Sequence, residues 1–234
     1  MIRPSTLHIP VLIALLMLGV GACQPVAAAS KALPAPTVDT PKAAAHGEQV
    51  AVLAGGCFWG IEAVFERVKG VREVTAGYSG GDAGTANYQD VSDGDSGHAE
   101  SVRITFDPAQ VSYGQLLQVF FSVALDPTQL NRQGPDSGTQ YRSVIFYGDA
   151  GQQKIAGAYL AQLAKAKAFA APIVTQLVPL RAFYPAEAYH QQFYDRHPHN
   201  PYIVFNDAPK VRQLEKLFPT LYQTPAQFVE VHLH

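Results

Sequence analysis

The sequence predicts an α+β protein in which a sheet and a layer of helices form a two-layer sandwich. Three observations lead to this class. Short apolar runs that suit strands alternate with segments whose apolar residues recur at helical spacing. The 234-residue chain has one Ala- and Pro-rich linker near its N-terminus, and it shows no repeat and no second linker. Hydrophobic residues make up 47% of the chain, enough for a sizeable core. One folded domain is the simplest organisation.

The first predicted strand is the apolar run from Gln49 to Ala54. A helix follows from Cys57, with apolar residues at helical spacing, and Gly70 is the kind of residue that ends a helix. Val71 to Tyr78 returns as a strand. Apolar and polar residues alternate over 102–106, which predicts a third, half-buried strand.

The second half of the core begins with Ser112 and Gln115, the signature of a capping box, which predicts a helix to about Val123. Tyr141 to Tyr147 predicts the fourth strand. The order β-α-β-β-α-β is that of a ferredoxin-like core. Further elements are expected at the C-terminal end, namely a helix over 150–169, a strand over 173–179, and helices over 186–197 and 208–218.

The N-terminal 22 residues are predicted to be a secretory signal, because Arg3 precedes an uncharged apolar stretch that ends in small residues. Val20-Gly21-Ala22-Cys23 resembles the lipobox of bacterial lipoproteins. That resemblance implies cleavage before Cys23, lipid attachment to its sulfur and, with Gln24 next, sorting to the outer membrane. The localisation expected is the periplasmic side of a bacterial envelope. A plain signal peptide and a soluble periplasmic protein are the alternative.

Residues 23–48 are rich in Ala and Pro and nearly free of large apolar side chains, so we expect a disordered tether. The folded domain is expected over 49–222, and a C-terminal tail over 223–234. The net charge of −2 and the absence of long charge runs argue against nucleic acid as a partner. The eight histidines show no spacing typical of a metal site, so no metal is expected.

Cys57 is the residue that suggests chemistry, since it lies between a strand and a helix in the run Gly55-Gly56-Cys57-Phe58-Trp59-Gly60. Free N–H groups and the positive end of the helix dipole favour a thiolate at such a position. Phe58 and Trp59 place aromatic surface beside the sulfur. Taken alone, these residues leave a reactive thiol and a buried structural cysteine equally open.

Gly-Cys-Phe-Trp-Gly resembles the signature of peptide methionine sulfoxide reductases of the A type. Further motifs resemble that family in the same order, so that the resemblance covers about residues 50–202. These motifs are Gly77-Tyr78-Ser79-Gly80-Gly81, Asn87-Tyr88, Gly97-His98-Ala99-Glu100, the glycine-rich loop over 131–143, and Ala186-Glu187-Ala188-Tyr189-His190-Gln191-Gln192.

The resemblance implies an enzyme that reduces the S epimer of methionine sulfoxide, free or in proteins, with electrons from thiols. Cys57 would attack the sulfoxide sulfur and become a sulfenic acid while methionine leaves. Glu100 would be the acid near the sulfoxide oxygen, because burial beside aromatic rings favours a neutral carboxyl. The implied substrate-binding residues are Phe58 and Trp59 at the S-methyl group, Tyr88 and Tyr141 at the oxygen, and Asp136 and Tyr202.

The chain departs from many family members after Tyr202, where they carry resolving cysteines. This sequence continues Ile203-Val204-Phe205-Asn206 and has no cysteine after Cys57. It is therefore similar to the one-cysteine subgroup, which implies no cofactor and an external thiol reductant, such as a thioredoxin-like or glutaredoxin-like protein. Phe193-Tyr194 also replaces the family's commoner Tyr-Leu.

Two other functions remain open beside the repair of oxidised exported proteins. A cysteine hydrolase or acyltransferase would use His98 or His190 as its base. A non-catalytic envelope lipoprotein would keep the fold for binding alone.

Overall fold

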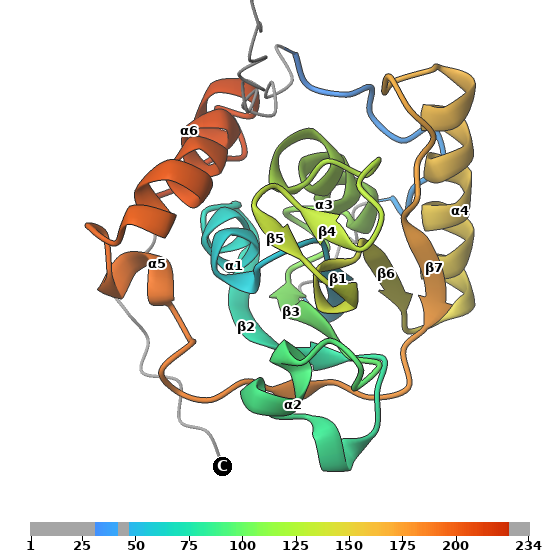
Figure 1. Ribbon diagram of the computed structural model, residues 1–234. Helices are drawn as coiled ribbons and strands as arrows, with labels where there is room; N and C mark the ends of the chain where they lie inside the picture. The colour runs from blue at the N-terminus through green and yellow to red at the C-terminus, as the bar shows by residue number, and fades with distance from the viewer. Residues whose placement is uncertain (1–30, 42–46, 225–234) are drawn as a thin grey trace, which may run out of the picture.

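The computed structural model describes residues 31–41 and 47–224. A six-stranded sheet lies at the centre of the molecule (Figure 1). The strand order is β7-β6-β1-β3-β2-β8. The strands are β1 (Gln49–Ala54), β2 (Val71–Ser79), β3 (Ala99–Phe106), β6 (Val144–Tyr147), β7 (Gln176–Pro179) and β8 (Tyr184–Pro185). The inner four, β6-β1-β3-β2, are antiparallel and have the order of a ferredoxin-like core, so that prediction is confirmed.

The helices lie together on one face of the sheet, which makes the architecture two-layered. The principal ones are α1 (Phe58–Glu66), α3 (Tyr113–Val119), α4 (Ala150–Lys165) and α6 (Ala208–Leu217). Along β1, Ala51 and Leu53 pack in the core beneath these helices, whereas Val52 and Ala54 belong to a smaller cluster on the opposite face. This alternation follows from the two-residue period of a strand. The second face is covered by the chain around Val178 and Phe183.

Short elements connect this framework. They are η1 (Ala83–Thr85), α2 (Tyr88–Ser92), the π-helical η2 (Phe120–Ala124), β4 (Arg132–Gln133), β5 (Asp136–Ser137), η3 (Thr139–Tyr141), α5 (Phe193–Arg196) and the π-helical η4 (Ile203–Asp207). The predicted capping box is present, because Ser112 and Gln115 bond reciprocally at the start of α3. The strand predicted from Tyr141 begins at Val144, since Tyr141 closes a 3₁₀ turn.

The helix predicted over 186–197 is wrong: only α5, four residues long, is helical there. Gln192 adopts a left-handed conformation with φ of 54°, which stops a helix from running through this segment. The side chain of Gln191 instead accepts from the backbone N–H of Ala76 and donates to its carbonyl. Bonding to β2 therefore replaces the bonding of a regular helix.

Residues 31–41, the described part of the predicted tether, lie against the folded domain and bond to it. The N–H of Leu33 bonds Ser122 at 3.1 Å, and the Tyr159 hydroxyl donates to the carbonyl of Pro34 at 2.9 Å. Asp39 accepts from the N–H of Gly114 at 2.9 Å. These bonds hold the segment along α3 and α4. The predicted signal and Cys23 lie outside the described residues.

Within residues 31–41 and 47–224, no helix has the length and apolar character needed to cross a membrane.

Candidate active site

Cys57 occupies the junction between β1 and α1, where it is the N-cap residue of the helix and only 8% exposed. The preceding Gly56 has a φ of +101°, a conformation that favours glycine. A Cβ at Gly56 would also lie 2.6 Å from the side chain of Gln133. The glycine therefore allows both the turn into α1 and the close approach of the glycine-rich loop to the cysteine.

Glu100 lies beside Cys57, at the start of β3. Its Oε2 accepts the backbone N–H of Phe58 at 3.0 Å, and its carboxyl also hydrogen-bonds the thiol of Cys57. Burial raises the pKa of Glu100 to about 8, and the nearby charge of Asp136 adds to this. The two hydrogen bonds act in the opposite direction without cancelling the burial. Glu100 therefore holds a proton at neutral pH.

The thiol of Cys57 is less acidic than its position at a helix N-terminus predicts. Burial raises its pKa well above the usual value, and the charges of Glu100 and Asp207 raise it further. The backbone N–H of Trp59 acts in the expected direction and lowers it, as does Lys210. The expected thiolate is therefore not favoured in the substrate-free site, because desolvation outweighs the helix terminus.

Two tyrosines and an aspartate from distant segments reach the same place. The Tyr202 hydroxyl donates to Asp136 on β5, and the charge of Cys57 acts on both Tyr202 and Tyr141. Burial is the largest cause of the raised pKa of each hydroxyl, so both stay protonated. Tyr88 lies further out, 38% exposed. The charge of Tyr88 adds to the raised pKa of Tyr141, behind burial as the largest cause. The three tyrosine hydroxyls predicted from the sequence therefore lie near one another around Cys57.

The two predicted aromatic residues differ in their surroundings. Phe58 is fully buried, with ring centroids 5.9 Å from Tyr78 and 5.1 Å from His190. Trp59 is half-buried and stacks on Phe193 at 3.8 Å, with the Tyr202 ring at its edge. Trp59 is therefore placed as part of an accessible aromatic wall, whereas Phe58 packs beneath it.

Neither histidine of the hydrolase alternative pairs with Cys57 among the described contacts. His98 accepts the N–H of Gly81 at Nδ1, and its Nε2 lies 2.9 Å from the carbonyl of Asp82. His190 accepts the indole N–H of Trp59 at Nδ1, at 3.2 Å. Both rings therefore hold neighbouring segments in place, as structural supports would.

Asp207 and Lys210 are site residues that the sequence reasoning missed. Asp207 is fully buried and lies 3.2 Å from the Lys210 ammonium group, and both charges act on Cys57. The signal in the sequence was slight, because Asp207-Ala208-Pro209 marks only a helix start. Nothing in that pattern reveals that the carboxyl points inward.

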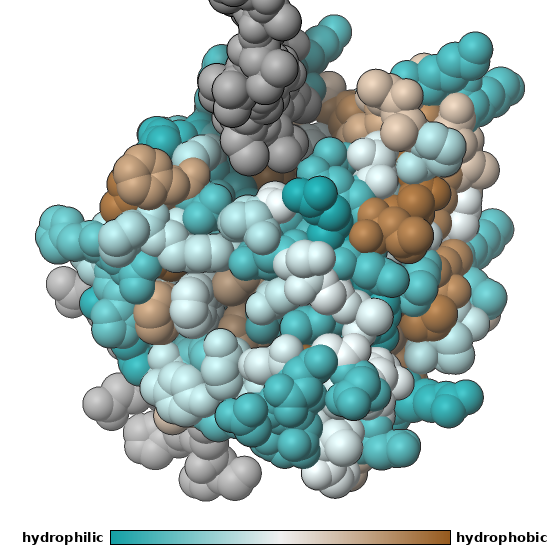
Figure 2. Space-filling view, viewed as in Figure 1, coloured by the Kyte–Doolittle hydropathy of each residue, from teal (hydrophilic) through white to brown (hydrophobic). Residues whose placement is uncertain are grey.

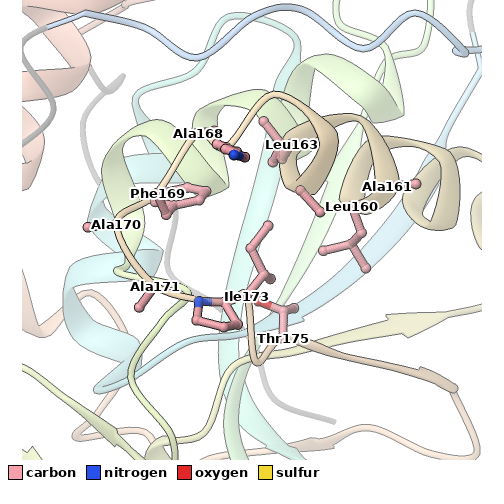
Figure 3. A pocket seen from close by; sticks show the side chains of 12 residues that line it. Leu160, Ala161, Leu163, Ala168, Phe169, Ala170, Ala171, Ile173 and Thr175 are labelled. Atoms are coloured by element: carbon pink, nitrogen blue, oxygen red, sulfur yellow. The ribbon is translucent and has the colours of Figure 1, made fainter.

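A separate apolar pocket of about 660 Å³ lies between the end of α4 and the chain that leads to β7. Leu160, Phe169 and Ile173 are among its lining residues (Figure 3). Hydrophobic surface gathers over the same elements, at the right of the space-filling view (Figure 2). No site residue named above lines this pocket. Across the described residues, no group of three or more His, Cys, Asp or Glu side chains is placed to hold a metal ion.

A buried thiol bonded to a protonated carboxyl, with tyrosine hydroxyls nearby, defines a thiol-dependent enzyme site. Comparison with known proteins specifies the class. Residues 49–221 match the family model described as peptide methionine sulfoxide reductase. The chain is 58% identical over 179 residues to peptide methionine sulfoxide reductase MsrA 2 of Mesorhizobium japonicum, covering 76% of this chain and 92% of the relative. It is 46% identical over 174 residues to MsrA of Thermus thermophilus, covering 74% and 97%.

Solved structures agree. Methionine sulfoxide reductase A of Corynebacterium diphtheriae matches with a TM-score of 0.57 and 31% identity, over 76% of this chain and 92% of that one. Reduced Mxr1 of Saccharomyces cerevisiae matches with a TM-score of 0.58 and 32% identity, over 65% and 87%. The chain belongs to the peptide methionine sulfoxide reductase family and is an oxidoreductase. The predicted family, enzyme class and α+β fold are confirmed.

Proposed function

We propose that this chain reduces the S epimer of methionine sulfoxide, with Cys57 as nucleophile and Glu100 as acid. The observation that carries the proposal is the buried Glu100 carboxyl. Burial raises its pKa to about 8, and the carboxyl accepts the N–H of Phe58 and hydrogen-bonds the Cys57 thiol at the start of α1. A sulfoxide sulfur is a poor electrophile until its oxygen is protonated or strongly hydrogen-bonded. A protonated Glu100 beside the thiol meets that requirement.

The reaction moves one oxygen atom. Glu100 gives its proton to the sulfoxide oxygen, and the carboxylate so formed takes up the proton of the Cys57 thiol to which it is bonded. The Cys57 sulfur attacks the methionine sulfur, and oxygen then passes to Cys57. Methionine is reduced and leaves, while Cys57 is oxidised to a sulfenic acid. The exchange of protons leaves Glu100 neutral again at the end of the cycle.

The remaining site residues bind the substrate. Trp59, backed by Phe193, offers an apolar wall to the S-methyl group, and buried Phe58 supports it. The hydroxyls of Tyr141 and Tyr88 donate hydrogen bonds to the sulfoxide oxygen. Asp136 accepts a hydrogen bond from the Tyr202 hydroxyl, and the Tyr202 ring packs edge-on with Trp59. These assignments are supported by the convergence of the side chains from five separate segments.

Regeneration of Cys57 uses an external thiol, as in the one-cysteine subgroup. No cysteine follows Cys57 in this sequence, which supports reduction by an external thiol rather than by a downstream cysteine. Two thiols of a thioredoxin-like or glutaredoxin-like protein reduce the sulfenic acid to thiol and water and leave as a disulfide. No prosthetic cofactor enters this cycle.

We place the enzyme in the bacterial envelope, where it repairs oxidised exported proteins. The support is the lipobox-like segment before Cys23, followed by Gln24. Growth with labelled fatty acid tests this directly: label should enter the wild-type chain and not the Cys23→Ser variant. Incorporation of label into neither chain would contradict lipidation.

A chiral assay tests the activity. With excess dithiothreitol, the purified protein should consume the S epimer of a methionine sulfoxide substrate and leave the R epimer. No consumption, or equal consumption of both epimers, contradicts the proposal. After one turnover without reductant, mass spectrometry should find a trappable sulfenic acid on Cys57. A Cys23–Cys57 disulfide in its place would contradict the one-cysteine cycle.

A further inference from the structure

A buried carboxyl on an apolar helix face needs a physical reason, because an unpaired charge in such a place is costly. Asp207 is the residue directly before α6, on the side of the helix where Val211 and Leu214 are buried. Its own side chain is 0% exposed. Its Oδ1 pairs with Lys210 at 3.2 Å. Its Oδ2 is buried and has no hydrogen-bond partner among the described residues. Apolar packing does not explain the buried Asp207–Lys210 pair, and hydrogen bonding does not fully compensate it, because one carboxylate oxygen of Asp207 has no partner among the described residues.

The pair lies against the first turn of α1, three residues after Cys57. A Cβ placed on Gly60 would lie 2.1 Å from Oδ1 of Asp207 and 3.0 Å from Nζ of Lys210. Glycine at this position therefore leaves the space that both charged groups use. The π-helical η4 leads directly into this contact, and π-turns inside helices are frequent at functional sites.

Both members of the pair act on Cys57, with opposite signs. Asp207 raises the pKa of Cys57 and Lys210 lowers it. Glu100 raises it from β3, and the Trp59 N–H lowers it from α1. Cys57 also acts on the hydroxyls of Tyr141 and Tyr202, both held protonated by burial. Asp136 lies in the same site, since its charge acts on Glu100 and on both of these hydroxyls.

Lys210 is a cation that acts on Cys57, and it also acts on Asp136, whose pKa burial raises and the charge of Lys210 partly brings down. The ammonium group therefore faces a site that otherwise contains acids. A positive charge at this place favours the thiolate over the thiol, which is the form that attacks.

We propose that Lys210, held against Gly60 by Asp207, is a positioning residue of the reduction, and that its charge stabilises the Cys57 thiolate as it forms. This inference rests on the proposed function of Cys57. Asp207 keeps the flexible lysine at one place against the first turn of α1, where its side chain is only 20% exposed.

Alkylation of Cys57 by iodoacetamide as a function of pH tests the inference without using the sulfoxide reaction. The full chain carries Cys23→Ser, which leaves Cys57 as its single thiol. Lys210→Met should move the alkylation midpoint to higher pH and slow alkylation at pH 8 by about threefold or more, because a favourable charge is lost. Lys210→Arg should return the rate to within about twofold of the parent, since the charge is kept.

Lys216→Met is the matched control, because it removes the same charge from an exposed position on the same helix. It should leave the midpoint unchanged. An equal shift in Lys210→Met and Lys216→Met would overturn the inference, as would failure of Lys210→Arg to restore the rate. If Lys210→Met does not fold, as judged by circular dichroism, Lys210→Gln replaces it under the same criteria.

A double-mutant cycle tests the part of Asp207. If Asp207 holds Lys210 in place, Lys210→Met should have at most half its effect on the alkylation rate in an Asp207→Asn background. An undiminished effect would overturn that role. The parent protein is assayed for sulfoxide reduction in parallel. If the parent protein does not reduce the sulfoxide but Lys210→Met still shifts the alkylation midpoint, only the proposed function is contradicted. If the parent is active but Lys210→Met does not shift the midpoint, only this inference is contradicted.

Discussion

Helices α1 and α4 pack on the same face of the sheet, yet only α4 follows the ordinary rules of a surface helix. Asp149 caps α4 by accepting the N–H of Gln152 at 2.8 Å. One stripe of α4 is buried, with Ile155 and Leu163 in it, while the other positions are half-buried or exposed. Helix α1 has no side-chain cap bond and is buried almost all round, with Glu62 among its buried residues.

The features in which α1 departs from these rules lie at its N-terminal end, next to the active site. Its N-cap is Cys57, where a Ser, Thr, Asn or Asp would stabilise the helix better. Its first turn contains Gly60, which lowers helix propensity but leaves room for Asp207. A protein that breaks local rules at a site and obeys them elsewhere has placed function ahead of stability there.

The largest expected effect in this comparison is the loss of activity in Cys57→Ser. Serine keeps the size and replaces a strong nucleophile by a weak one, so the reductase rate should fall by at least about a thousandfold. The thermal midpoint should stay close to that of the parent. Ala164→Ser, which adds a hydroxyl at an exposed position of α4, is the control and should keep full activity. A Cys57→Ser protein that retains a tenth of the rate would refute a nucleophilic role.

Glu100→Gln should have the next largest effect, a loss of about a hundredfold to ten-thousandfold in rate below pH 8. The burial that raises the pKa of Glu100 to about 8 keeps the wild-type acid protonated up to that pH. Wild-type activity should therefore fall as pH rises through about 8, and the gap to the variant should narrow. A pH–rate profile shows this directly. A variant that keeps the wild-type profile would exclude proton donation by Glu100.

The stability of Glu100→Gln separates this loss from misfolding. The pKa of Glu100 is higher in the folded protein than in the unfolded chain, so the folded state binds the extra proton. Its contribution to stability is complete below the unfolded pKa and is lost as pH rises through about 8. The variant should consequently be more stable than wild type at pH 9, by on the order of 1 kcal/mol, in urea unfolding. A less stable variant at that pH would contradict the assignment.

The sequence predicts the regular parts of this molecule because they follow local rules. The strand over 49–54 and the capping box at Ser112 are examples. It places Cys57, Glu100 and Tyr202 through family motifs, and the structure brings them together. It misses the turns over 186–192, where the side chain of Gln191 bonds to the distant β2. It also misses Asp207, because inward orientation depends on Gly60, far away in the chain.

A matched pair of glycines sharpens the comparison between the two helices. Gly60→Ala and Gly157→Ala both place alanine in a helix, which alone stabilises by about 0.5–1 kcal/mol. At Gly157 the new methyl group meets only Leu177 at an ordinary 3.6 Å, so α4 should show that gain. At Gly60 it meets Asp207, and the overpacking should lower the free energy of unfolding by about 1–3 kcal/mol. Equal gains at both sites would show that Asp207 does not occupy the first turn of α1.

A small effect, confined to stability, is expected from the cap of α4. Asp149→Ala removes the acceptor for the N–H of Gln152 and should lower the free energy of unfolding by about 1 kcal/mol. Asp149→Asn is the control, because its side-chain oxygen can still accept that bond and most of the stability should return. Both variants should reduce methionine sulfoxide at the parent rate, since the cap lies on the scaffold helix. A drop in rate for Asp149→Ala that Asp149→Asn shares would show that α4 also shapes the site, and the contrast with α1 would then be lost.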